Sequence, residues 1–227
     1  MFLVANFKAH SLNIETYIRQ LSTLKTLKTK IVLAPPYPYL LQKTISPFPI
    51  CSQDVSAFGI GPYTGEVPAK LLKSLGVSFC LVGHSERRAF FHEDNPTLKK
   101  KFELCLEEGL QPIFCVGETQ QEHENNLTLP SITKQLLEVI PASASSVMVA
   151  YEPIWSIGSG KTPDPSSIKT VVDTIKTLYP RSIVLYGGSV NATNAAKLAR
   201  LADGLLVGSA SNDIQTFIQI IQQLETL

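Results

Sequence analysis

The sequence predicts an α/β fold, a closed (β/α)8 barrel, because short apolar runs alternate with helical segments along all 227 residues. The runs contain few polar residues, as expected of parallel strands that are covered on both faces. Eight such runs are spread fairly evenly along the chain, although the third is weak. They span residues 2–5, 31–34, 50–51, 79–82, 113–116, 147–150, 183–186 and 205–207.

The segments between these runs have the spacing of helices with one buried face. Apolar residues follow the i, i+3, i+4, i+7 rule at positions 14, 17, 18, 21 and 24, and again at positions 168, 171, 172 and 175. Such alternation implies parallel strands joined by right-handed crossovers. An open doubly wound sheet would alternate in the same way. Eight even units, with no GxGxxG after the first run, favour the closed barrel.

Composition limits the organisation and the function classes. No linker rich in Pro, Gly or Ser divides the chain, so we expect one domain over residues 1–227. The formal net charge is +1, and the longest basic tract, 99–101, lies on a helical pattern, so we predict no nucleic-acid partner. The N-terminus is too short and uncharged for a signal peptide, and no apolar run approaches membrane-spanning length. We therefore expect a cytoplasmic protein without membrane association.

The four cysteines do not form a recognisable framework. Cys51, Cys80, Cys105 and Cys115 have no CxxC spacing, and three of them lie in or beside apolar runs. This pattern favours reduced thiols in the core over disulfides or a metal site.

Polar residues and glycines follow most of the predicted strands. Asn6 and Lys8 follow the first, His84 the fourth and Glu152 the sixth, while glycine-rich turns at 187–189 and 208–209 follow the last two. In parallel α/β barrels all these strand ends open onto one face, where active sites lie. Residues remote in sequence are therefore expected to converge there.

Glu152 and the loop after it indicate a base beside a lid. Pro153 restricts the backbone at Glu152, and Gly158 and Gly160 allow backbone N–H groups to approach an anion. Alone, a glutamate after a strand is usually a solvated charge, and a glycine-rich loop is usually only a loop. Three glycine-rich turns at successive strand ends are stronger evidence, and they predict a site for a substrate monophosphate.

His84 and Lys8 complete a set suited to one reaction type. A lone histidine after a strand is more often a structural partner, but at a helix N-terminus the dipole favours its neutral form. Lys8 at the barrel mouth would be a fixed cation facing an anionic ligand, and Asn6 could orient it. A base, a neutral electrophile and a cation can remove a proton next to a carbonyl and stabilise the enediolate.

At this point the chain resembles the triosephosphate isomerase family over its whole length. The matching segments are 6–8 (NFK), 63–66 (YTGE), 83–88 (GHSERR), 115–118 (CVGE), 150–155 (AYEPIW), 158–162 (GSGKT), 186–190 (YGGSV) and 208–210 (GSA). The resemblance implies a TIM barrel that interconverts dihydroxyacetone phosphate and glyceraldehyde 3-phosphate, without a cofactor, in glycolysis and gluconeogenesis.

The resemblance also assigns roles to individual residues. Glu152 would shuttle the proton, His84 would polarise the carbonyl, and Lys8 with Asn6 would bind the anionic substrate. Glu86 would support Lys8. The backbone would grip the phosphate at four positions, Gly158, Ser189, Gly208 and Ser209.

The family is usually dimeric, which the resemblance implies here. Its third loop, around residues 57–66, would insert into the partner so that Thr64 buttresses the partner's site. The residues alone leave two possibilities, because an apolar cluster in such a loop either packs under its own loop or marks an interface. The cluster consists of Phe58, Ile60, Pro62 and Tyr63.

The chain departs from the family at two positions. Pro163 stands where family members commonly have alanine at the trailing end of the lid, and proline has no N–H to donate. Ser209 replaces the second glycine of the usual pair. We expect the lid to close nonetheless, with Ser189 bonded near Gly160.

Two other functions are alternatives. The first is that of another phosphate-binding barrel enzyme, such as an aldolase or a biosynthetic isomerase; an aldolase acting through a Schiff base needs a lysine within the barrel, and none of the apolar runs contains one. A catalytically inactive phosphate-binding barrel, acting as an interaction protein, should have lost Glu152, His84 or Lys8, and all three are present.

Overall fold

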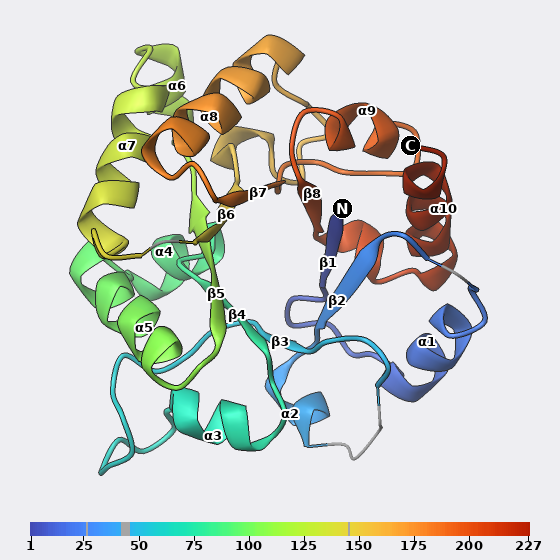
Figure 1. Ribbon diagram of the computed structural model, residues 1–227, viewed down its shortest axis with the longest axis horizontal. Coiled ribbons are helices and arrows are strands. Elements are labelled where there is room, and N and C mark those ends of the chain that lie inside the picture. Colours follow the sequence, from blue (N-terminus) through green and yellow to red (C-terminus); the bar gives the residue numbers. More distant parts are fainter. Residues whose placement is uncertain (26, 42–45, 145) are drawn as a thin grey trace.

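The computed structural model describes residues 1–25, 27–41, 46–144 and 146–227, and it contains a sheet of eight parallel strands (Figure 1). The strand order is β2-β1-β8-β7-β6-β5-β4-β3. The strands are β1 Phe2–Asn6, β2 Lys30–Ala34, β3 Cys51–Ser52, β4 Phe79–Val82, β5 Gln111–Val116, β6 Met148–Tyr151, β7 Ile183–Tyr186 and β8 Gly204–Val207.

The two edges of this sheet meet and close the barrel. Leu33 of β2 forms a parallel bridge with Ile50, and its N–H donates to the carbonyl of Pro49 at 3.0 Å. The expected third strand is therefore real but divided: Ile50 pairs with β2, whereas Cys51 and Ser52 pair with β4. The predicted (β/α)8 barrel is confirmed.

Helices surround the barrel (Figure 1). The α-helices are α1 Ile14–Leu21, α2 Tyr37–Leu40, α3 Ala69–Ser74, α4 Ser85–Phe91, α5 Asn95–Glu107, α6 Gln120–Glu124, α7 Thr128–Val139, α8 Pro165–Leu178, α9 Ala195–Ala199 and α10 Ile214–Glu225. Two short 3₁₀ helices, η1 Ile154–Ser156 and η2 Ser209–Ser211, follow β6 and β8. The two predicted helices correspond to α1 and α8, although α1 ends before Leu24.

The strands separate two apolar cores. Residues of one face, such as Val4, Ile113 and Leu185, fill the inside of the barrel. Residues of the other face, such as Leu3 and Val149, pack against the helices together with Ile168 of α8. Because both faces of each strand are covered, the strands read as apolar runs without alternation.

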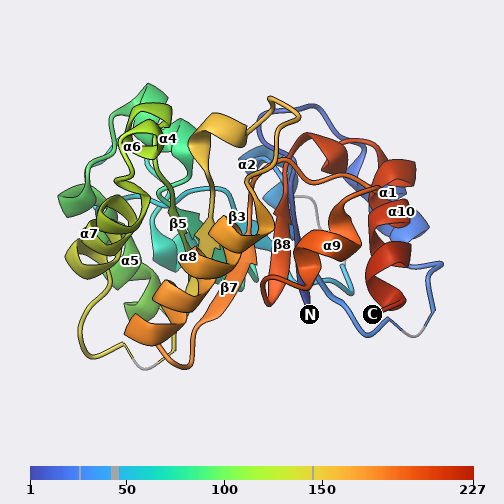
Figure 2. The ribbon, with the colours of Figure 1, turned by 90° about the horizontal axis from the view of Figure 1, so that it is seen from above.

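The carboxyl ends of the strands all point the same way. In Figure 2 the N-terminus, where β1 begins, lies at the lower edge, so the strands run upward toward the loop between β6 and α8. Lys30, the first residue of β2, lies at the opposite end, with its ammonium 5.4 Å from the ring centroid of Phe2. It is therefore remote from the face on which a barrel active site forms.

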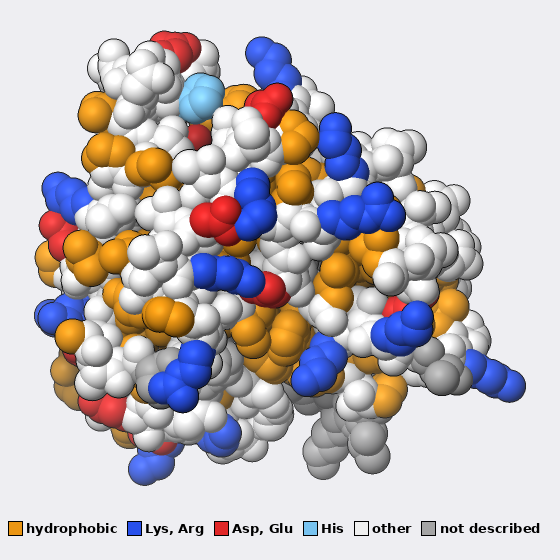
Figure 3. Space-filling view, turned by 45° about the horizontal axis from the view of Figure 1, so that its top comes forward, with side chains coloured by type: hydrophobic (Ala, Val, Ile, Leu, Met, Phe, Trp, Pro, Cys, Tyr) orange, Lys and Arg blue, Asp and Glu red, His pale blue; other side chains and the backbone are white. Residues whose placement is uncertain are grey.

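The cysteines and the surface agree with the composition. Cys51, Cys80, Cys105 and Cys115 are free and buried. On the face shown in Figure 3, basic and acidic side chains are scattered among neutral and apolar ones rather than gathered by sign. In the part of the chain that the structure describes, every helix is too short or too polar to cross a membrane.

Candidate active site

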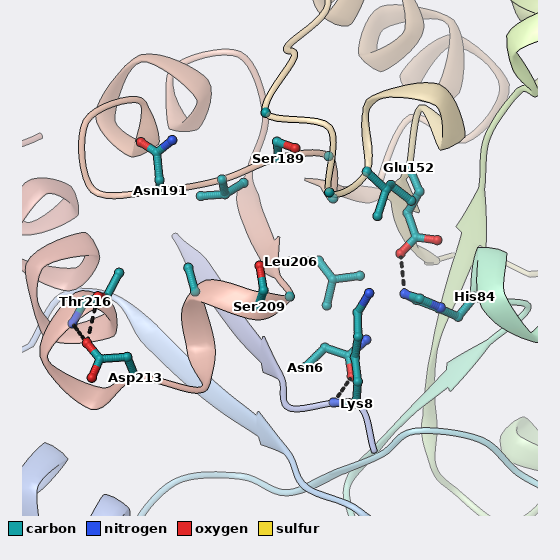
Figure 4. Close-up of a pocket in the computed structure, with 18 residues that line it drawn as sticks. Asn6, Lys8, His84, Glu152, Ser189, Asn191, Leu206, Ser209, Asp213 and Thr216 are labelled. Carbon is teal, nitrogen blue, oxygen red and sulfur yellow. Dashed lines mark hydrogen bonds and ion pairs between the residues drawn. The ribbon is translucent and has the colours of Figure 1, made fainter. Parts of the chain in front are cut away.

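A cavity of about 520 Å³ opens at the carboxyl ends of the strands (Figure 4). It brings together residues from the ends of β1, β4, β6, β7 and β8, as the sequence predicts for a single barrel mouth. Eight of the predicted site residues line it, and a ninth, Glu86, contacts Lys8. Its lining includes Asn6, Lys8, His84, Glu152, Gly158, Ser189, Gly208 and Ser209.

Glu152 is held at this mouth although its side chain is only 2% exposed. One carboxylate oxygen, Oε2, accepts the backbone N–H of Ser85 at 3.1 Å, at the first turn of α4. The other, Oε1, lies 3.2 Å from Nε2 of His84. The carboxylate is therefore fixed by hydrogen-bond donors. Because the site is buried, the electrostatic interactions of its charge are stronger than they would be in water.

Two glycines make room for this glutamate. A Cβ on Gly117 would lie 1.8 Å from the carbonyl oxygen of Glu152, and one on Gly187 would lie 3.0 Å from its Cγ. The first separation is impossible without moving the backbone, so Gly117 is required for the approach of β5 to β6. Sequence reasoning missed Gly117 as part of the site, although it lies within the CVGE segment.

His84 is the N-cap of α4, and its hydrogen bonds define its tautomer. Nδ1 accepts the backbone N–H of Glu86 at 3.2 Å. A nitrogen that accepts carries no proton, so the ring is neutral and its proton lies on Nε2, facing Glu152. The expected neutral imidazole follows from this local geometry.

Lys8 projects into the cavity from a strained backbone. Its φ is 51°, in the left-handed region, and its N–H donates to Oδ1 of Asn6 at 3.0 Å. Its ammonium lies 2.6 Å from Oε1 of Glu86. Gln53 holds the same turn from the other side, because its Nε2 donates to the carbonyls of Lys8 at 2.9 Å and Ala34 at 2.7 Å. No local signal in the sequence distinguishes Gln53.

The far end of the cavity consists of backbone from three turns. Gly158 and Gly160 come from the loop after β6, Gly188 and Ser189 from the end of β7, and Gly208 and Ser209 from the end of β8. Ser209 begins η2, so its backbone is right-handed and the replacement of glycine causes no strain there. First-turn N–H groups have no partner inside a helix and are available to an anion.

The loop 157–163, which we name the lid, is exposed to solvent at residues 158–162, and we call this arrangement open. Positions where a Cβ would extend from Gly158 and Gly160 meet no atom within 4 Å. The hydroxyl of Ser189 donates to the carbonyl of Ser156 at 2.6 Å. In this open arrangement Ser189 thus binds Ser156, the residue just before the lid, whereas the sequence predicts a bond near Gly160 on closure.

Thr64 lies apart from this cavity. It is exposed on the loop between β3 and α3, which extends from the body at the lower left of Figure 1. At the tip the rings of Phe58 and Tyr63 stack with centroids 4.4 Å apart, and Ile60 is 61% exposed. Within one chain Thr64 therefore contributes nothing to the site.

Cys115, beside the site, is not a nucleophile. Burial, and then the nearby Glu152 carboxylate, raise the pKa of its thiol well above the ordinary value. The thiol therefore stays protonated at neutral pH. Among the residues that the structure describes, no three His, Cys, Asp or Glu side chains are arranged to hold a metal ion.

Comparison of the sequence with known proteins shows the family to which the chain belongs. The sequence model described as triosephosphate isomerase matches residues 1–224. The chain belongs to the triosephosphate isomerase family. It is 40% identical over 211 residues to a protein of that name from Chlamydia trachomatis, covering 85% of this chain and 77% of the relative. A protein of the same name from Wolbachia pipientis is 35% identical over 233 residues, covering 98% and 93%.

Pro163 is the other position at which this chain departs from the triosephosphate isomerase family pattern. Pro163, at the trailing end of the lid, is buried beside Trp155, and both line a second cavity next to the site. Both ends of the lid are thus packed against the barrel, while its centre projects into solvent.

Proposed function

We propose that this chain interconverts dihydroxyacetone phosphate and glyceraldehyde 3-phosphate, the reaction that gives its family its name. The observation that carries the proposal is the 3.2 Å contact between Glu152 Oε1 and Nε2 of a neutral His84. A buried carboxylate next to a neutral donor suits proton removal beside a carbonyl, because the same pair offers both a base and an electrophile.

Each step uses a group already in place. Substrate would enter between the pair, so that Nε2–H of His84 turns from Glu152 to the carbonyl oxygen. The freed Oε1 would take a proton from the adjacent carbon, leaving an enediolate with the negative charge on oxygen. Return of a proton to the neighbouring carbon, with His84 exchanging a proton between the two oxygens, completes the isomerisation.

Lys8 would supply the positive charge that this enediolate needs. Its ammonium already forms an ion pair with Glu86, which is 42% exposed. An entering anion would therefore interact with a lysine that keeps its carboxylate partner. Asn6 would fix the turn through its bond to the Lys8 N–H. These contacts favour roles for Lys8 and Asn6 in binding and charge stabilisation.

The phosphate would occupy the end of the cavity formed by Gly158, Ser189, Gly208 and Ser209. These positions offer backbone N–H groups, and the one nearby carboxylate of the described lining beyond the base, Asp213, accepts hydrogen bonds from Thr216 of its own helix. The lid would close over the phosphate and exclude water, which strengthens the electrostatic interactions inside. Closure would require the Ser189–Ser156 bond to exchange for one closer to Gly160.

We further propose a homodimer acting in the cytoplasm. A hollow of about 320 Å³ lies beside the site, lined by Asn6, Lys8, Gln53 and Glu86 among others. The exposed stack of Phe58 and Tyr63 provides an apolar tip that a second copy could seat in such a hollow, bringing Thr64 to the Lys8 turn. Sedimentation equilibrium at twice the 24.9 kDa chain mass supports the dimer, and the mass of a single chain contradicts it.

A coupled assay with glyceraldehyde 3-phosphate tests the reaction. The wild-type chain is expected to convert this substrate. Glu152→Gln should lower kcat by at least about 10³-fold, because a general base typically contributes about 10²–10⁴-fold. The amide keeps the size of the side chain and can still contact His84. Equal turnover in the two proteins would refute the role of Glu152, and inactivity of the wild type would favour an inactive phosphate-binding barrel.

A further inference from the structure

A second cavity, of about 330 Å³, lies beside η1, the turn that leads into the lid and that we call the leading turn. It shares no lining residue with the catalytic cavity. Tyr151 of β6 and Trp155 of η1 line it on one side. Glu118, after β5, and His123 of α6 line it as well, and the other walls come mainly from α7 and α8. Tyr151 precedes Glu152 in the chain and Trp155 follows it by three residues, so this cavity lies beside the segment that joins the base to the lid.

Trp155 is held there by a hydrogen bond and a ring stack. Its indole Nε1–H donates to Oε1 of Glu118 at 2.8 Å, and the hydroxyl of Tyr151 donates to the same oxygen at 3.2 Å. The imidazole of His123 stacks on the indole with ring centroids 4.4 Å apart and an interplanar angle of 24°. Nδ1 of His123 lies 3.7 Å from the same Glu118 oxygen. One histidine therefore contacts both Trp155, in the turn that leads into the lid, and Glu118, the carboxylate that accepts the indole N–H.

The charged groups around His123 are few. Of the described residues that line the cavity, Glu118, Tyr151 and His123 are the titratable ones. Burial raises the pKa of the Tyr151 hydroxyl far above its usual value, so this group stays neutral. On α6 itself, Glu122 is bonded to Thr119 and Ser131, and Glu124 to Gln120. The lining residues from α7 and α8 are uncharged.

Glu118 has the capacity for a further partner. The residue is fully buried, and its second oxygen, Oε2, has no hydrogen-bond partner among the described residues. Burial is also the largest cause of the raised pKa of this carboxyl. A cation arriving next to this carboxylate would relieve the cost of burying its charge.

We propose that His123 is a positioning residue for the lid, and that its protonated form holds Trp155, and with it the leading turn, in the open arrangement. The imidazolium adds an ion pair to Glu118, the carboxylate that accepts the indole N–H, and a cation over the indole face of Trp155. η1 joins Glu152 to the lid, and in this proposal the lid closes by a turn of η1. Protonation of His123 therefore opposes closure and makes the reaction, on which this inference rests, respond to pH.

Fluorescence reports the first half of this mechanism. Trp155 is the only tryptophan in the chain, so indole emission reads its surroundings directly. A protonated imidazole in contact with indole quenches its emission, and histidine changes charge between pH 5 and 8. The wild-type emission should fall as the pH is lowered through this range. His123→Phe, which keeps a stacked ring and carries no charge, should show no such titration.

Kinetics report the second half. We expect the ratio of wild-type to His123→Phe kcat/KM to fall by about two- to fivefold between pH 8 and pH 5.5, because the His123 side chain is 42% exposed and each added contact is weak. The ratio removes ionisations common to both proteins, including those of the substrate phosphate and of Glu152. At pH 8 the two proteins should be about equally active.

Each arm can overturn the inference. A fluorescence titration that persists unchanged in His123→Phe would assign it to another group, such as Glu118. A kinetic ratio that is constant with pH would show that the stack does not influence the lid. Absence of turnover in both proteins would instead overturn the proposed function, since the fluorescence arm does not depend on activity.

Discussion

Two clusters of four ionisable side chains lie around α4, and they are built in opposite ways. The mouth cluster consists of Lys8, His84, Glu86 and Glu152 and lines or borders the catalytic cavity. The wall cluster consists of Asp54, Arg87, Glu93 and Lys101 and lies behind it. Consecutive residues, Glu86 and Arg87, belong to different clusters.

The wall cluster is closely paired. The ammonium of Lys101, whose side chain is 5% exposed, lies 2.7 Å from Asp54 and 2.6 Å from Glu93. Arg87 contacts the same two carboxylates at 2.9 and 2.6 Å. Burial raises the pKa of Asp54, while the positive charge of Lys101 opposes the rise. Each charge depends on its neighbours to be tolerated in the interior.

The mouth cluster is arranged more loosely. Lys8 has one carboxylate partner and Glu86 is 42% exposed, while His84 is neutral and separates the cation from Glu152. These contacts can be exchanged for contacts with an anion at small cost. The comparison teaches that the two clusters have different roles. The fully paired charges of the wall cluster stabilise the fold, whereas the partly paired charges of the mouth cluster are free to exchange their partners for a substrate.

Breaking the wall cluster should have the largest effect on stability. Lys101→Met keeps the length of the side chain but leaves Asp54 and Glu93 with only Arg87 between them. We expect the free energy of unfolding to fall by about 3–5 kcal/mol, because the loss of one partner strands a buried charge. Urea unfolding followed by circular dichroism measures the change.

A double variant sharpens this result. Asp54→Asn with Lys101→Met removes both members of one pair and should recover part of the lost stability. If Lys101→Met alone cost less than about 1 kcal/mol, the wall cluster would not be the stabilising one. The catalytic constants of the folded variants should stay near those of the wild type.

Breaking the mouth cluster should lower the activity and leave the stability almost unchanged. Lys8→Met removes the cation that faces the anionic intermediate, and we expect kcat/KM to fall by about 10²–10³-fold, as for loss of an oxyanion-stabilising donor. The unfolding free energy should change by less than about 1 kcal/mol, since partly exposed ion pairs contribute little. A large loss of stability with intact activity would reverse the assignment of the two clusters.

A smaller effect should come from the side chain that supports the mouth cluster. Gln53→Ala releases the carbonyls of Lys8 and Ala34 and so loosens the left-handed turn at Lys8. A drop of about five- to tenfold in kcat/KM is expected, in line with about 1 kcal/mol for a hydrogen bond. Gln53→Glu, which can reach the same place but cannot donate, should behave like the alanine variant in the same coupled assay.

Much of this molecule is predictable from local patterns. The runs at 79–82 and 183–186 coincide with β4 and β7, and β6 is displaced by one residue from the run at 147–150. The third strand was the least certain, because Ile50 and Cys51 pair with different neighbours and two residues carry little periodic signal. The predicted site residues, other than Thr64 on its exposed loop, lie at or beside one cavity because strand ends share one face.

By itself the sequence determined the order of strands and helices and the residue type at each strand end, since strand periodicity, caps and glycine turns are short-range properties. Only the tertiary structure decided which partner each side chain has. The Ser85 N–H that holds Glu152 is 67 residues away from it in the chain, and the amide that holds Lys8 is 45 residues away. The stack of His123 on Trp155 likewise joins α6 to η1. Such contacts depend on the closure of the barrel, which brings distant strand ends together, and no local pattern encodes them.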